Sequence, residues 1–144
     1  MAQLLLQRML AERGGAQRIR VRSGVIAPYA RDGMIPSLDA RLALREVGIH
    51  LAEDGLASTD LRRHPDVVAE ADLIVTITAA QRTMLRALGA ADGKPVVTLR
   101  ELGGEEGDIE DPAGQGEEVF RACRDEIRRA LEQAIDRLLL ALEP

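Results

Sequence analysis

Residues Asp72 to Thr78 constrain the fold of this chain more than any other segment. They read DLIVTIT, which is rich in β-branched residues and apolar at successive positions, as is typical of a parallel strand buried on both faces. Pro95 to Leu99 predicts a second short apolar strand. Helical segments alternate with these strands, so the sequence predicts an α/β fold: a small parallel sheet with helices on both faces.

Apolar residues at three- and four-residue intervals indicate where the helices lie. The predicted helices are Ala2–Arg13, Ser37–Gly48, Pro65–Glu70, Ala80–Leu88 and Glu117–Leu142. In the second of these, Ser37 is the expected N-cap, and Leu38, Leu42 and Leu44 are expected on one buried face. The alternation of Ile19 to Arg22 predicts a further, half-buried strand.

Length and composition limit what the chain can be. Its 144 residues predict a single domain over residues 1–144. The formal net charge of −5 argues against nucleic acid and anionic membrane as partners, because both attract a basic face. No apolar run is long enough to span a bilayer, and the one cysteine cannot form an internal disulfide. These features predict a cytoplasmic location.

The acidic loop Asp108 to Pro112, with Glu105 and Glu106 before it, is the strongest chemical candidate. Crowded carboxylates repel one another, so one of them is expected to retain a proton near neutral pH and to act as a general acid. Pro112 restricts the backbone of Asp111 and thereby its direction. The alternative is a solvated loop that precedes and caps the last helix.

The other candidates have simpler interpretations. Cys123 is expected to be a small buried hydrophobe, not a nucleophile, because it lies on the apolar stripe of the last helix. That stripe consists of Val119, Cys123, Ile127, Leu131, Ile135 and Leu138. His50 and His64 lack metal-ligand spacing, so no metal is predicted. Ser23 precedes Gly24 in either a phosphate-binding loop or a strand-ending turn. The glycine pairs lack the spacing of nucleotide motifs, and no cofactor is predicted.

These segments, in this order, resemble the low-molecular-weight protein tyrosine phosphatases over nearly the whole chain. Met1 to Leu6 resembles the stretch directly after the active-site motif of that family, where Cys-X5-Arg-Ser-Pro leads into Met-Ala-Glu. Val21 to Val25 resembles the second strand of the family and the turn after it. Glu46 to Leu51 resembles a Gly-Ile-Asp segment of the family. Glu70 to Thr78 resembles its third strand. Asp108 to Pro112 matches the general-acid loop. Continuing into Glu118 to Glu126, the pattern is most like bacterial members, including those that act on phosphoarginine.

The resemblance implies a three-layer fold and hydrolysis of phosphorylated proteins or small phosphomonoesters, with no cofactor. It assigns Asp111 the role of general acid, and it places Ser23 and Ala113 at substrate-binding positions. Ala113 stands where the family usually has an aromatic residue, and Asp54 to Ala57 lacks the usual His and Arg. The strand and the Cys-X5-Arg loop that precede the first helix in the family have no counterpart in residues 1–144.

In the family, the strand without a counterpart lies between those that correspond to Ile19–Arg22 and Asp72–Thr78. We therefore expect one of three outcomes: the two strands pair directly, a partner chain fills the position, or the sequence is an incomplete gene product. Each unpaired buried backbone group costs roughly 1–3 kcal/mol. Whether these two strands find a partner therefore affects the stability of the fold.

Three functional hypotheses follow from the resemblance. The first is a phosphatase domain whose start was placed too late or that is naturally truncated, and that is inactive as this chain. The second is a pseudophosphatase that serves as a binding or regulatory module, in one version a homodimer whose sheet edges meet. The third, an arsenate reductase relative, requires redox cysteines beyond Cys123.

Overall fold

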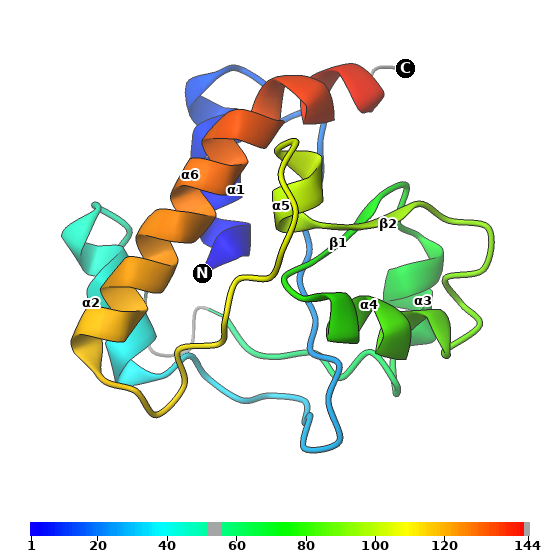
Figure 1. The fold of residues 1–144 in the computed structure, drawn as a ribbon, viewed down its shortest axis with the longest axis horizontal. Coiled ribbons are helices and arrows are strands. Elements are labelled where there is room, and N and C mark those ends of the chain that lie inside the picture. The colour runs from blue at the N-terminus through cyan, green and yellow to red at the C-terminus, as the bar shows by residue number, and fades with distance from the viewer. Residues whose placement is uncertain (52–55, 143–144) are drawn as a thin grey trace.

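A computed structural model describes residues 1–51 and 56–142, and it has the predicted α/β architecture (Figure 1). The elements are α1 (Ala2–Glu12), α2 (Leu38–Glu46), α3 (Pro65–Ala69), β1 (Ile74–Thr76), α4 (Ala79–Arg86), β2 (Val96–Thr98), α5 (Leu99–Leu102) and α6 (Glu117–Ala141). The five predicted helices are present with small shifts of their ends. Helix α5 was not predicted.

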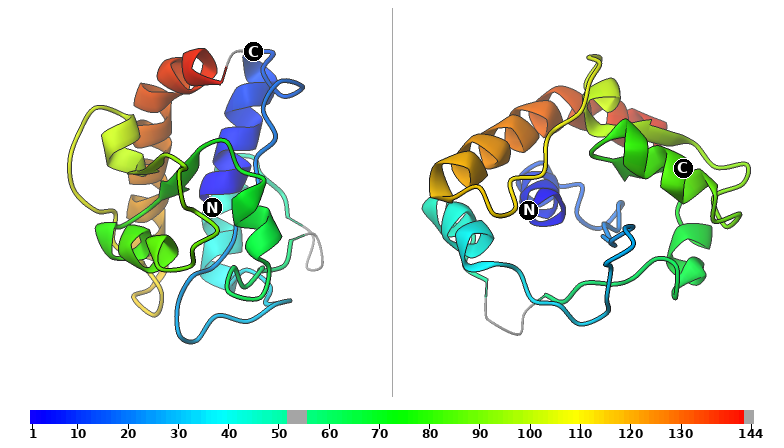
Figure 2. Two further views of the ribbon diagram at one scale, coloured as in Figure 1. Left: turned by 90° about the vertical axis from the view of Figure 1, so that its right-hand side faces the viewer. Right: turned by 60° about the horizontal axis from the view of Figure 1, so that its bottom comes forward.

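In the described residues the sheet consists of two short parallel strands, with Ile74 opposite Val96 and Thr76 opposite Thr98. Helices α1, α2 and α6 gather on one side of it, and α3 and α4 lie on the other (Figures 1 and 2). The buried apolar side chains accordingly form two clusters. The first is built from Leu5, Leu44, Leu99, Ile109, Cys123, Ile127, Ala130 and Leu131, and the second from Val68, Leu85, Ala91 and Val96.

The prediction of a strand at Ile19–Arg22 is wrong. Residues 19–24 have no regular secondary structure, and no backbone hydrogen bond joins residues 20–24 to another described residue. The direct pairing with β1 that was one expected outcome does not occur. Alternating side chains favour a strand, but a strand forms only when a neighbouring chain segment accepts and donates the ladder hydrogen bonds.

Two apolar side chains expected in the core are exposed. Val75, in the middle of β1, is 38% exposed, although the sequence predicted burial on both faces. The strand order explains this, because β1 pairs only with β2 and no described strand lies on its other side to extend the sheet. Leu38 is 63% exposed, since α2 buries Ala43 and Leu44 against α6 and its first residue faces solvent.

The starts of the helices follow the sequence signals closely. Ser37 caps α2 by accepting a hydrogen bond from the Ala40 amide at 3.3 Å. Thr78 and Gln81 form a reciprocal capping box at the start of α4. At the end of α1, Gly14 adopts a φ of +73°, which a glycine reaches without strain, and the chain then turns away from the helix.

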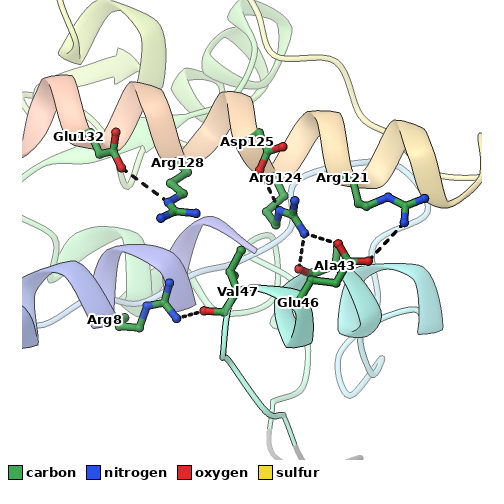
Figure 3. Close-up of polar contacts among 9 residues, drawn as sticks. All are labelled: Arg8, Ala43, Glu46, Val47, Arg121, Arg124, Asp125, Arg128 and Glu132. Carbon is green, nitrogen blue, oxygen red and sulfur yellow. Dashed lines mark hydrogen bonds and ion pairs between the residues drawn. The ribbon is translucent and has the colours of Figure 1, made fainter.

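The carboxyl end of α2 is held by arginines from two other helices (Figure 3). Arg124 of α6 donates to the Ala43 carbonyl oxygen at 2.8 Å and contacts Glu46 at 2.9 Å. Arg8 of α1 donates to the Val47 carbonyl oxygen. The last carbonyls of a helix lack partners within the helix and carry partial negative charge, so both arginines stabilise this end and fix α2 against α1 and α6.

Helix α6, with 25 residues, is the longest element and forms one wall of the first core cluster. Of the predicted apolar stripe, Cys123, Ile127, Leu131 and Ile135 are buried, whereas Val119 is 37% exposed. Charged residues cover its other face. Within the described ranges, no helix combines the length and apolar character that crossing a membrane requires.

Candidate functional site

One candidate site residue, Ser23, contacts the first turn of α1. The Ser23 hydroxyl donates to the Gln3 side-chain oxygen in that turn. Met1 and Ala2 pack against the cluster that contains Ile109 and Cys123. Figures 1 and 2 show the loop between α5 and α6 passing the amino end of α1. That end has no side-chain cap, so its amide groups are free to attract negative charge.

The acidic loop is fixed by two buried anchors on either side of its exposed carboxylates. Ile109 is fully buried, and its amide donates to the Ile77 carbonyl just beyond β1 at 3.1 Å. Pro112 is also buried, whereas Glu110 and Asp111 are exposed. The loop therefore presents Asp111 from a rigid base next to the end of a strand.

Asp111 is oriented by its own turn. Its Oδ1 accepts a hydrogen bond from the Ala113 amide at 2.9 Å, and the Gln115 side chain donates to the Asp111 carbonyl at 2.9 Å. These two hydrogen bonds hold Asp111 within its own turn, and the effect predicted for Pro112 stays a prediction. Ala113 is exposed and, having only a methyl side chain, builds no wall beside the carboxylate.

The carboxylates of this loop have separate partners rather than one another. Asp108 Oδ1 accepts from the Ala79 amide at the start of α4 at 2.8 Å. Glu105 forms an ion pair with Arg100 at 3.4 Å. No group of three or more His, Cys, Asp or Glu side chains that could hold a metal occurs among the described residues. The described contacts thus do not show the crowding of these carboxylates that the sequence suggested.

Arg100 is the site residue that the sequence analysis missed. From α5 it donates to the Asp108 carbonyl at 3.3 Å and contacts Glu105, and its Nη2 lies 3.0 Å from Glu126 on α6. One guanidinium thus ties the acidic loop to two helices. No spacing rule relates these four positions, so a single sequence carries no signal for the contacts.

Cys123 is buried, as predicted, and does not resemble a nucleophile. Its thiol donates a weak hydrogen bond to the Glu110 carbonyl at 3.7 Å. Burial raises the pKa of the Cys123 thiol, and the negative charges of Glu126 and Asp111 raise it further, while the Met1 amino group opposes them. These effects favour the uncharged thiol.

The remaining candidates lie away from this centre. His64 contacts Asp32 at 2.9 Å. The Asp60 amide, and after it His64, lower the pKa of Asp32 by hydrogen bonding to its carboxylate. His50 is exposed. The prediction on Asp54 to Ala57 falls partly outside the described residues, because 54 and 55 are among those not described.

The chain is similar to known proteins in sequence and in fold. Residues 1–141 match the family described as low molecular weight phosphotyrosine protein phosphatase. The chain is 32% identical over 116 residues to the protein-arginine-phosphatase of Geobacillus stearothermophilus, covering 80% of this chain and 72% of that protein.

Two solved structures extend the likeness to the fold. The YwlE arginine phosphatase from Geobacillus stearothermophilus superposes with a TM-score of 0.75 at 29% identity, covering 96% of this chain and 83% of that one. A YwlE mutant with a phosphorylated active-site serine superposes with a TM-score of 0.82 at 26% identity, covering 95% and 85%.

Proposed function

Because the chain belongs to the low molecular weight phosphotyrosine protein phosphatase family, we propose that it supplies the scaffold and proton donor for hydrolysis of phosphotyrosine or phosphoarginine. The observation that carries this proposal is the position of Asp111. The proposal is supported by the Ala113 amide, which holds the Asp111 carboxylate at 2.9 Å, and by the buried Ile109, which bonds to the residue just beyond β1. The substrates would be phosphorylated proteins or small phosphomonoesters.

In the proposed reaction Asp111 donates a proton to the leaving group as the bond to phosphorus breaks. The same carboxylate then accepts a proton from the water that releases phosphate. The free amide groups at the start of α1 favour a phosphate placed there, because they lie at the positive end of the helix dipole. Ser23, through Gln3, holds the neighbouring segment against this turn.

The attacking atom is the part that residues 1–144 do not supply. Their one cysteine, Cys123, is buried against Glu110, and its raised pKa keeps the thiol protonated. A protonated and covered thiol cannot attack phosphorus. We therefore propose that the 144-residue polypeptide itself does not turn over phosphomonoesters, whatever a longer product does.

An assay of the purified 144-residue polypeptide with para-nitrophenyl phosphate tests this proposal. We expect no vanadate-sensitive release of para-nitrophenol, because a proton donor alone does not form the phosphocysteine intermediate. A family phosphatase that has its catalytic cysteine, assayed in parallel, shows that the conditions permit turnover. Vanadate-sensitive activity of the 144-residue polypeptide would sink the claim of inactivity.

The second candidate function is a non-catalytic binding or regulatory module. It is favoured by the exposed Val75 on β1, which leaves apolar strand surface available to another chain. In one version, two copies of the chain form a homodimer in which the edges of their sheets meet at β1. Multi-angle light scattering is expected to give twice the chain mass, and a well-folded monomer at high concentration would exclude that version.

A cytoplasmic location likewise stays a prediction.

A further inference from the structure

A pocket of about 370 Å³ lies in the seam between α1 and α6. On the side of α1 it is lined by Leu5, which is only 1% exposed, and by the half-buried Met9. On the side of α6 it is lined by Arg128 and Glu132. Pockets that hold small molecules have volumes of roughly 300–1,000 Å³ and combine an apolar lining with a few polar groups. This pocket has both kinds of lining and a volume near the lower end of that range.

The charges that line the pocket favour a ligand with one negative charge. The arginines of the pocket are Arg8, Arg13 and Arg128, and its glutamates are Glu12 and Glu132. Three positive charges against two negative charges leave one positive charge in excess. A monoanion neutralises this excess, whereas a dianion such as a phosphate monoester is also repelled by both glutamates. The charge balance therefore favours a monocarboxylate over a phosphate ester.

Arg128 is the arginine of this pocket that is best placed to hold a carboxylate. Its described contact is an ion pair from Nε to Glu132 at 3.6 Å, which is longer than a hydrogen bond. Its two terminal nitrogens make no hydrogen bond to any described residue, and Figure 3 shows the side chain pointing from α6 toward α1. The other two arginines of the pocket each have a closer partner elsewhere in the chain. A guanidinium group with free terminal nitrogens matches the two oxygens of a carboxylate.

We propose that the pocket between α1 and α6 binds a small monocarboxylate that has an apolar body. The carboxylate accepts hydrogen bonds from the terminal nitrogens of Arg128, and the apolar body covers Met9 and reaches Leu5. The bound molecule thereby bridges the two helices. This site is independent of the proposed phosphatase function, because none of the residues that line the pocket is a candidate site residue.

An NMR titration of the ¹⁵N-labelled 144-residue chain with 3-phenylpropanoate tests the proposal. We expect saturable shifts of amide signals from α1 and α6. Acetate keeps the charge without the apolar body, and 3-phenylpropanamide keeps the apolar body without the charge, so each is expected to bind about tenfold more weakly or worse. Equal affinity for either analogue, tighter binding of phenyl phosphate, or no saturable shift at millimolar 3-phenylpropanoate would overturn the proposal.

Two substitutions at neighbouring positions of α6 provide the matched test on the protein side. Arg128→Gln is expected to weaken the binding of 3-phenylpropanoate about tenfold, because glutamine donates hydrogen bonds without the positive charge. Arg129→Gln changes the net charge equally at an exposed position that does not line the pocket, and it is expected to leave the affinity unchanged. The amide spectrum of each variant reports whether the fold is retained. Equal losses in the two variants would show a general attraction of anions to α6 and refute the proposal.

Discussion

Replacing Asp111 with asparagine is expected to lower kcat for a phosphotyrosine peptide by roughly two to four orders of magnitude, the usual range for loss of a general acid. The measurement uses a form of the chain extended ahead of Met1 by a family-type strand and Cys-X5-Arg loop, so that a nucleophile is present. Asparagine keeps the size and can still accept the hydrogen bond from Ala113, but it cannot donate the proton.

The loss of activity can be compared between substrates with different leaving groups. This comparison distinguishes the loss of proton donation from a structural effect of the substitution. A phenol as weakly acidic as tyrosine needs the proton as it leaves, whereas the more acidic para-nitrophenol needs it less. The loss caused by Asp111→Asn is therefore expected to be larger for the peptide. Glu110→Gln, at the exposed neighbouring position, serves as the control and is expected to retain activity. Equal losses for both substrates would contradict the assignment of Asp111 as general acid.

Truncation of Ile109 to alanine is expected to lower the free energy of unfolding by about 3 kcal/mol, within the range for large-to-small changes at buried sites. Ile109 is fully buried in the first core cluster, so truncation of its side chain leaves a cavity in that cluster. Since typical domains are stable by only ~5–15 kcal/mol, this is a substantial fraction. Urea unfolding followed by circular dichroism measures the change.

Ile35→Ala is the matched control for this experiment. It deletes the same atoms from a side chain that is 51% exposed in the loop before α2. We expect its free energy of unfolding to stay within about 0.5 kcal/mol of the original chain. If both substitutions cost the same, Ile109 would not anchor the acidic loop in the way the structure indicates.

The sequence predicted local structure well where the signal lies within a few residues. The stripe that ends at Leu138 defined α6, and Ser37 was recognised as a helix cap. The helix α5 escaped notice although Thr98 and Glu101 have the spacing of a capping box, so that signal was readable. The strand at Ile19–Arg22 failed for a different reason, because strand formation depends on a partner that side-chain alternation does not specify.

The candidate site was predicted only in part, because a single sequence shows local constraints and not contacts between distant positions. Asp111 and Pro112 are adjacent in sequence, so their mutual constraint was visible before the structure. The contact of Ser23 with Gln3, and the hydrogen bonds that Arg100 makes to the Asp108 carbonyl and to Glu126, join positions far apart in the chain. Such contacts arise from packing of the first core cluster, and helical or strand periodicity does not encode them.

The covered position of Cys123 makes the chain convenient for spectroscopy. Because it is the one thiol in 144 residues and is only 7% exposed, maleimide reagents have little access to it in the folded state. A cysteine introduced at any exposed position would then be labelled selectively, without first replacing the native one. Dyes or spin labels on opposite sides of the sheet could in this way report how its two apolar clusters separate during unfolding.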